Sequence, residues 1–139
     1  MSEPEHFTVP ITVRPDDIDE QGHVNNVVFV RWVQDAATAH WRARALPADQ
    51  AALVWVVVRH EIDYKRPAFA GDTLVAETWV GPASRRTFER RTRIAHAGDG
   101  RVLAEARTLW CPLAATTLRP VDPGEAVRER FAVPGPLEG

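Results

Sequence analysis

A chain of 139 residues suits one domain with a single hydrophobic core, and 45% apolar with 26% charged residues is an ordinary globular balance. The net charge of −2 gives no bulk field to attract nucleic acid, and a single cysteine excludes a framework of internal disulfides. The sequence has no N-terminal signal pattern and no uninterrupted apolar run of about 18 residues, so we expect no membrane partner and a cytoplasmic location.

The first half of the chain predicts a strand and then a long helix. Residues 1–6 are polar and are expected to be frayed, whereas residues 7–14 are rich in β-branched side chains and predict a strand, with Pro10 indicating an edge position. Residues 24–45 contain no Gly or Pro and have apolar side chains on nearly every face, which predicts a helix buried all round. The two asparagines at its start, Asn25 and Asn26, can both supply an N-cap oxygen.

The second half predicts four strands joined by tight turns. These strands are expected at residues 52–67, 73–81, 86–96 and 102–114, followed by an irregular or short helical tail from residue 119. Tight turns make neighbouring strands antiparallel. The sequence therefore predicts an α+β fold, in which an antiparallel sheet wraps around a long central helix in one domain over residues 1–139, with its core at about 7–131. A sheet of this size cannot cover such a helix completely, so we also expect an oligomer.

An acidic loop, DIDEQGHVNN at residues 17–26, precedes the predicted helix. A helix start presents free backbone N–H groups at the positive end of the helix dipole, where they can polarise a carbonyl oxygen. Asp19 could attack that carbonyl or deprotonate a water, and Gly22 would let a ligand approach the backbone closely. Helix capping explains acidic residues in this position equally well, and it is the favoured role for Asp17.

The segment DIDEQGHVNNVVFVRWVQDA resembles the signature of the hotdog-fold thioesterases of the 4-hydroxybenzoyl-CoA thioesterase type. The matching residues are Asp17, Asp19, Gly22, Val24, Asn26 and Phe29. The segments IDYKRPAFAGDTL, RRTFERRTRI and LRPVDPGEAVRERF resemble later parts of the family pattern in the same order. The resemblance covers residues 7 to about 131 and implies the hotdog fold.

The resemblance implies an enzyme that hydrolyses an acyl-CoA thioester. By this resemblance, Asp19 takes the place of the family's catalytic nucleophile or general base. The backbone N–H near Asn26 takes the place of the group that polarises the thioester carbonyl. His23 is a second candidate base, because histidine exchanges protons near neutral pH, although it suits a surface or capping role equally well. Phe29 and Gln34 stand where many members have Tyr and Glu. These two differences are expected to alter the acyl pocket or the residues beside it.

Six arginines between residues 85 and 101 form a local basic stretch. Arg85, Arg86 and Thr87 match the family's nucleotide-binding stretch and are expected to contact the phosphates of coenzyme A, for which guanidinium groups are well suited. A solvated strand face is the alternative. The resemblance implies contacts between subunits, in a homo-oligomer that is a dimer or a tetramer.

Two rival functions stay open, an acyl-thioester hydratase or dehydratase and a non-catalytic acyl-CoA-binding protein. The first needs a histidine facing an acid, and the sequence has no clear pairing of this kind for His23 or His60. The five tryptophans are expected in the core. No histidine pair has zinc-ligand spacing, so we expect no metal and no cofactor apart from the coenzyme A of the substrate.

Overall fold

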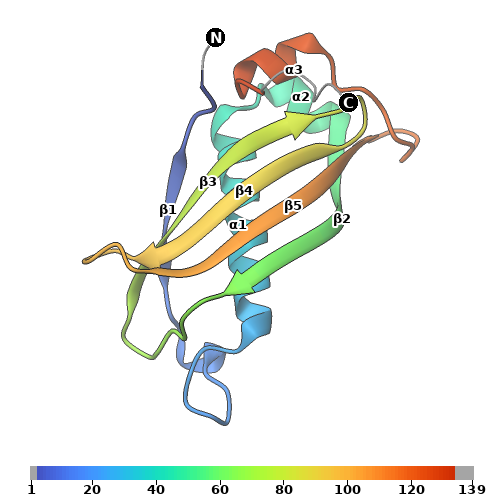
Figure 1. Ribbon diagram of the computed structural model, residues 1–139. Coiled ribbons are helices and arrows are strands. Elements are labelled where there is room, and N and C mark those ends of the chain that lie inside the picture. Colours follow the sequence, from blue (N-terminus) through green and yellow to red (C-terminus); the bar gives the residue numbers. More distant parts are fainter. Residues whose placement is uncertain (1–2, 134–139) are drawn as a thin grey trace.

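Five strands form one antiparallel sheet, with the long helix α1 packed across one face (Figure 1). The computed structural model describes residues 3–133, so the predicted tail beyond Val133 lies outside the described residues. The strand order is β1-β3-β4-β5-β2. The strands are β1 (Phe7–Thr12), β2 (Leu53–Tyr64), β3 (Thr73–Ala83), β4 (Phe88–His96) and β5 (Val102–Ala114). This arrangement confirms the predicted fold class and the edge position of the strand with Pro10.

Helix α1 (Asn26–Arg44) is buried along one face, not all round as expected. Its buried residues follow helical spacing and are Phe29, Trp32, Val33, Ala36, Ala37 and His40. Between them lie Arg31, Gln34 and Asp35, which are exposed, and Val27 is 71% exposed. The prediction was wrong because the polar residues of this segment are grouped on one face of the helix, and that face is exposed.

Two short helices, α2 (Pro47–Ala52) and α3 (Glu125–Arg130), cover the end of the molecule where α1 finishes (Figure 1). Pro47 follows the end of α1 and begins α2, because proline suits the first turn of a helix. Helix α3 confirms the short helical tail expected after residue 119. Within residues 3–133, none of the helices is long and apolar enough to cross a membrane.

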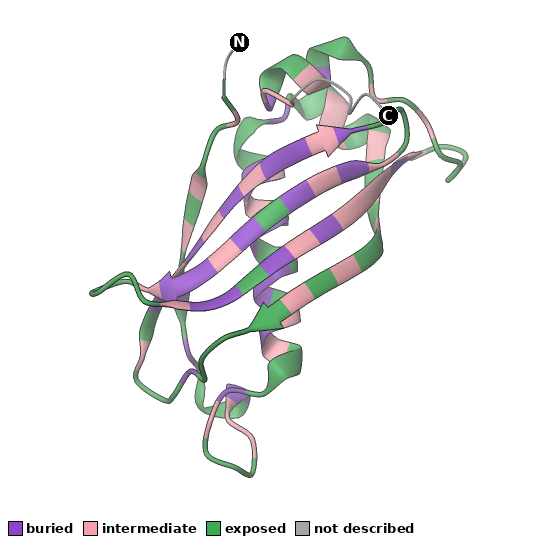
Figure 2. Ribbon diagram, viewed as in Figure 1, coloured by how far each residue is buried: buried purple, intermediate pink, exposed green. Residues whose placement is uncertain are grey.

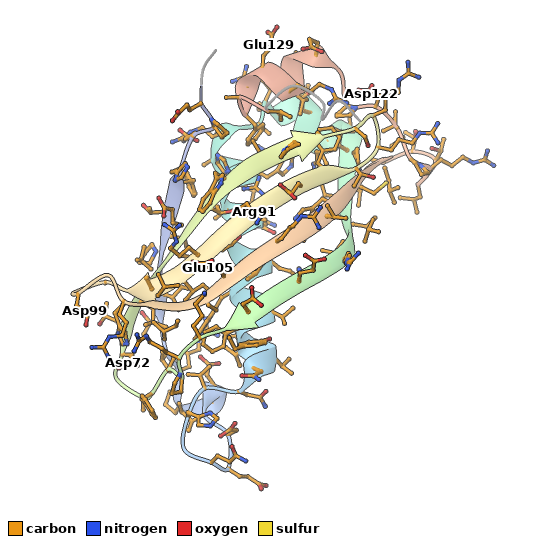
Figure 3. The ribbon with its side chains drawn as sticks, in the orientation of Figure 1. Asp72, Arg91, Asp99, Glu105, Asp122 and Glu129 are labelled. Atoms are coloured by element: carbon orange, nitrogen blue, oxygen red, sulfur yellow. The ribbon has the colours of Figure 1, made fainter. Side chains whose placement is uncertain are left out.

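The two faces of the sheet differ in chemistry. Buried and less buried residues alternate along β3 and β4 (Figure 2), and the inner face packs on α1. Arg91 on β4 and Glu105 on β5 belong to the face turned away from the helix (Figure 3). Arg90, one position before Arg91, therefore points inward and is buried. The sequence alone groups these arginines as one basic stretch.

The N-terminal segment is held more firmly than expected. Glu5 contacts both His40 and Arg44 on α1, with distances of 2.8 Å from Glu5 Oε1 to His40 Nε2 and 3.0 Å from Glu5 Oε2 to Arg44 Nε. The ring of His6 stacks on Trp79, with 4.3 Å between centroids. The expectation of a frayed segment is wrong for these residues, and Trp79 lies on the outer face of the sheet instead of in the core.

Candidate active site

The acidic loop forms a tight hairpin just before α1, and it projects beyond the lower end of the sheet (Figure 1). Ile18 and Val24 pair as an isolated antiparallel bridge at its base. The Asp19 N–H donates to the carbonyl of His23 at 2.8 Å, and the Gly22 N–H donates to the carbonyl of Asp19 at 3.1 Å. Gly22 has φ +87°, a conformation that other residues adopt only with strain. The turn therefore favours a glycine at this position.

The carboxylate of Asp19 is held by its own turn. Its Oδ1 accepts a hydrogen bond from the Gln21 N–H at 2.9 Å. Its Oδ2 lies 3.5 Å from Nδ1 of His23, and 26% of the Asp19 side chain remains exposed. The structure thus brings Asp19, Gly22 and His23 together, and leaves one carboxylate oxygen beside an imidazole and near solvent. Such an Asx turn also has a purely local explanation.

The start of α1 presents a free donor. Asn25, and not Asn26, is the N-cap: its side chain accepts from the Val27 N–H at 3.0 Å and its carbonyl from the Val28 N–H at 2.9 Å. Among the described residues, the N–H of Asn26 donates no hydrogen bond. Because this group lies at the positive end of a 19-residue helix, it is suited to bind an oxygen that carries negative charge.

Two further residues fix this helix start. Asp17 is buried, accepts from the Arg14 N–H at 2.8 Å and from Nη2 of Arg31 at 3.0 Å, and its carbonyl accepts from the Asn25 N–H. These contacts agree with the expected capping role. The hydroxyl of Tyr64 donates to the carbonyl of Asn26 at 3.1 Å. This contact joins residues 38 positions apart, and no local pattern indicates it.

The predicted phosphate-binding residues lie at the other end of the sheet. Arg85 and Arg86 are exposed in the turn between β3 and β4, where Oγ of Ser84 accepts from the Thr87 N–H at 3.1 Å. The Asp19 loop follows β1, whose last residue pairs with the first residue of β3. The 11 residues of β3 then separate the two features by on the order of 35 Å at about 3.3 Å per residue. Within one chain, the Asp19 loop and the Arg85–Thr87 turn therefore do not come close to each other.

The remaining arginines do not form a basic patch. Arg91 lies 3.4 Å from Glu89, Arg93 3.2 Å from Glu77, and Arg101 3.9 Å from Asp99. Arg90 points to the opposite face. The stretch predicted as one basic region is therefore divided between paired charges on the outer surface and one buried cation.

Sequence reasoning missed a buried network around Arg90. Its Nη1 donates to Nδ1 of His40 at 2.9 Å and to Oγ1 of Thr78 at 3.1 Å, so His40 donates from Nε2 to Glu5. Burial and then the Arg90 charge lower the pKa of His40 from 6.5 to about 4. Burial lowers the pKa of Arg90 to about 10, which leaves it charged at neutral pH. The alternation along β4 signals the inward position of Arg90, since Phe88 and Ile94 share its face.

Histidine–carboxylate pairs exist, contrary to the sequence prediction. His23 faces Asp19, and His40 faces Glu5. His60 instead lies 2.9 Å from the Thr108 hydroxyl and 3.3 Å from the Gln34 amide, and burial lowers its pKa. Local sequence patterns do not reveal the pairs, because the first depends on a turn conformation and the second joins distant segments.

No metal site is visible in the part of the chain that the structure describes, since no three His, Cys, Asp or Glu side chains gather closely enough to hold an ion.

Comparisons with known proteins agree with this fold. The structure of Slr0204, a 1,4-dihydroxy-2-naphthoyl-CoA thioesterase from Synechocystis, superposes with a TM-score of 0.80 at 21% identity, over 92% of this chain and 96% of that one. A thioesterase from Thermus thermophilus, solved with coenzyme A and Zn, is 28% identical with a TM-score of 0.78, over 89% of this chain and 90% of that one.

Among curated proteins, the chloroplastic acyl-[acyl-carrier-protein] hydrolase FATB3 of Cuphea viscosissima is 30% identical over 67 residues. The match covers 48% of this chain but only 16% of that protein. The model of a family described as the thioesterase-like superfamily matches residues 13–131, which include the acidic loop, α1 and every strand except the first. The resemblance stated from the sequence is thereby confirmed, and the chain belongs to the thioesterase-like superfamily, with the hotdog fold.

Proposed function

We propose that this protein hydrolyses an acyl-CoA thioester at the Asp19 loop. The observation that carries the proposal is a loop with a quarter-exposed carboxylate on Asp19 that leads directly into the start of α1, where the N–H of Asn26 is free. Membership of the thioesterase-like superfamily supports the reaction type. The 28% identical thioesterase that was solved with coenzyme A supports the choice of carrier.

In the proposed mechanism the thioester carbonyl oxygen accepts a hydrogen bond from the Asn26 N–H. The helix dipole stabilises the negative charge that develops on this oxygen when the carbonyl carbon is attacked. A free N–H at this point contributes more to the transition state than to the ground state, because the charge is larger in the transition state.

Asp19 supplies the attack by one of two routes. As a nucleophile it forms an anhydride with the acyl group while the C–S bond breaks, and water then cleaves the anhydride and restores the carboxylate. As a general base it accepts a proton from water, the hydroxide adds to the carbonyl carbon, and the proton passes to the departing sulfur. Both routes give the free acid and coenzyme A. His23, 3.5 Å from the carboxylate, is a second candidate to accept a proton.

We further propose that the site is completed by a homo-oligomer. Strand β2 is an edge strand, and its side chains Val54, Val56 and Val58 are 39%, 38% and 62% exposed. Exposed valines beside unpaired backbone groups favour pairing with a second β2. In a two-fold antiparallel pair, the end of one chain that holds Asp19 meets the opposite end of its partner. Arg85, Arg86 and Thr87 of one chain would then approach the Asp19 loop of the other and bind the phosphates.

Thiol release from a panel of aromatic, short, medium and long acyl-CoAs tests the proposal. Asp19→Asn keeps the side-chain shape and removes the charge, so we expect it to slow the best substrate by at least about 100-fold. Glu20→Gln is the matched control, because Glu20 is an exposed acid in the same loop, and its rate should equal that of the wild type. Equal rates for Asp19→Asn and the wild type would refute the role of Asp19.

The pairing of His23 with Asp19 keeps a hydratase or dehydratase as a second candidate function. That reaction adds water to the acyl group, or removes it, while the thioester stays intact. The same panel, analysed by mass spectrometry, separates the two: a gain or loss of one water by the acyl-CoA without free thiol indicates the second function. Tight acyl-CoA binding without any reaction indicates a non-catalytic binding protein.

A further inference from the structure

The end of β2 and the connection from β2 to β3 contact both halves of the proposed site, at the lower end of the sheet (Figure 1). The carbonyl of Ala68 accepts a hydrogen bond at 2.8 Å from the N–H of Val24, which closes the hairpin that holds Asp19. The hydroxyl of Tyr64 donates at 3.1 Å to the carbonyl of Asn26, the first residue of α1. The carboxylate and the free N–H of the site are therefore both positioned by the same short segment.

This segment is itself firmly fixed. The N–H of Lys65 donates to the carbonyl of Leu103 at 2.7 Å, which continues the pairing of β2 with β5. Further along, the Phe69 N–H donates to Oδ2 of Asp72 at 2.8 Å, and the Asp72 N–H donates to the carbonyl of Phe69 at 3.1 Å. Ala68 is fully buried. A segment that is held by the sheet and by its own turn can position the groups that bond to it.

The ring of Tyr64 is held between the sheet and α1. Tyr64 lies on the same face of β2 as Ile62, which packs against the core. Its ring meets Phe29 edge-on, with 5.6 Å between the centroids and 87° between the planes. Phe29 is buried and lies about one helical turn after Asn26. The ring therefore packs beside the start of α1, and the hydroxyl reaches the residue that begins the helix.

The hydroxyl of Tyr64 fixes the orientation of Asn26. Within the described part of the chain, Tyr64 is the only side chain that forms a hydrogen bond with Asn26. The N–H and the carbonyl of Asn26 flank one Cα, so a bond that holds the carbonyl also limits the rotation of the N–H. A hydrogen bond weakens steeply as its angle departs from linear, and a reacting group must be held within about 0.5 Å of its productive position. Even a small movement of Asn26 therefore weakens its bond to a charged oxygen.

We propose that Tyr64 is a positioning residue of this site: its hydroxyl holds Asn26 so that the N–H of Asn26 points at the thioester carbonyl oxygen. The inference rests on the proposed function, in which that N–H stabilises the negative charge on the oxygen. Tyr64 acts through Asn26 and does not itself contact the substrate. Because the charge on the oxygen is largest in the transition state, loss of the hydroxyl should lower kcat and leave KM unchanged.

The kinetics of thiol release by Tyr64→Phe test this role on the best acyl-CoA of the panel. The variant keeps the ring against Phe29 and removes only the hydroxyl. We expect kcat to fall about tenfold and KM to stay within about twofold of the wild type. Thr117→Val is the matched control, because it removes a hydroxyl that accepts the Arg119 N–H at 3.3 Å in an exposed turn, and it should have the wild-type kcat. An unchanged kcat in Tyr64→Phe, or an equal fall in Thr117→Val, would overturn the proposal.

The carbonyl of a bound substrate gives a readout that a loss of stability does not change. Asp19→Asn is expected to turn over slowly, so it can be loaded with an acyl-CoA that is isotope-labelled at the carbonyl carbon, and the carbonyl stretch can be measured by infrared spectroscopy. A hydrogen bond to the carbonyl oxygen lowers this frequency. Adding Tyr64→Phe to Asp19→Asn should therefore raise the frequency, and the same frequency in both proteins would overturn the role of Tyr64.

A failure of the proposed function gives a different result from a failure of this inference. If the wild type releases no thiol from any acyl-CoA of the panel, the reaction itself is refuted, and the role of Tyr64 is refuted with it. If the wild type is active and Tyr64→Phe is equally fast, only the role of Tyr64 is refuted, and the role of Asp19 is unaffected.

Discussion

The two ends of α1 hold polar groups in different ways. Before its first turn, Asp19 is fixed by hydrogen bonds within a short hairpin closed by Ile18 and Val24, and its carboxylate remains partly exposed. Towards its last turn, His40 is fully buried and connects Arg90 on the sheet to Glu5 in the N-terminal segment. The first group is held by a local turn, and the second by contacts between distant parts of the chain.

Because of this difference, we expect changes at Asp19 and at His40 to affect different properties of the protein. A carboxylate that depends only on its own turn can be altered with little effect on the core, so its change should appear mainly in the reaction rate. A buried histidine between a guanidinium and a carboxylate supports the packing of three segments, so its change should appear mainly in the free energy of unfolding.

The largest effect on stability is expected from His40→Leu. This change leaves Arg90 buried without its acceptor, and it should lower the free energy of unfolding by about 3 kcal/mol. Urea denaturation followed by tryptophan fluorescence measures the loss. His96→Leu is the control, because His96 is the last residue of β4, lies 3.9 Å from Asp72 and is partly exposed, so its loss should cost less than about 1 kcal/mol. A small effect in both variants would show that the network contributes little.

A smaller effect is expected from acid. The pKa of His40 is about 4 in the folded protein and near the ordinary 6.5 when unfolded, so the unfolded chain binds more protons between these values. The stability that neutral His40 provides is complete above pH 6.5 and is lost as the pH falls to about 4. We expect a loss on the order of 2 kcal/mol over this window. The pH dependence should be shallower in His40→Leu, and parallel curves would contradict this assignment.

The smallest effect on stability is expected at the other end, from Gly22→Ala. No described atom lies within 4 Å of the added Cβ, so the cost comes only from φ +87° and should be about 1 kcal/mol. Gly98→Ala is the matched control, since its Cβ also meets nothing within 4 Å and its φ is not in the strained range. Gly22→Ala should slow thiol release more than Gly98→Ala does, because it shifts the turn that holds Asp19. If the two variants had equal rates and equal stabilities, the conformation of the Gly22 turn would have no effect on the reaction.

Local patterns predicted most elements of the fold. Strand alternation and the Asp-Gly turn located the four later strands within a few residues, and the gap in Gly and Pro located α1. The role of Pro47 as the first residue of α2 was missed, because the same residue type ends one helix and begins another. The cytoplasmic location and the absence of a cofactor remain predictions.

The site could be predicted only where it depends on neighbours in sequence. Asp19, Gly22 and His23 lie together because one short turn joins them. The contacts of His40 with Glu5 and Arg90 join residues 35 and 50 positions apart, and these contacts are set by the packing of α1 on the sheet. Sequence spacing carries no direct information on such contacts.

The central claim is that Asp19, at the open end of α1, carries out the reaction. The most direct test measures the initial rate of thiol release from the best acyl-CoA of the panel, in Asp19→Asn and in the control Glu20→Gln. We expect Asp19→Asn to be at least about 100-fold slower than the wild type and Glu20→Gln to be as fast as the wild type, because only the first variant removes the reacting charge. A rate within a few-fold of wild type would contradict the claim and move the reaction to another residue.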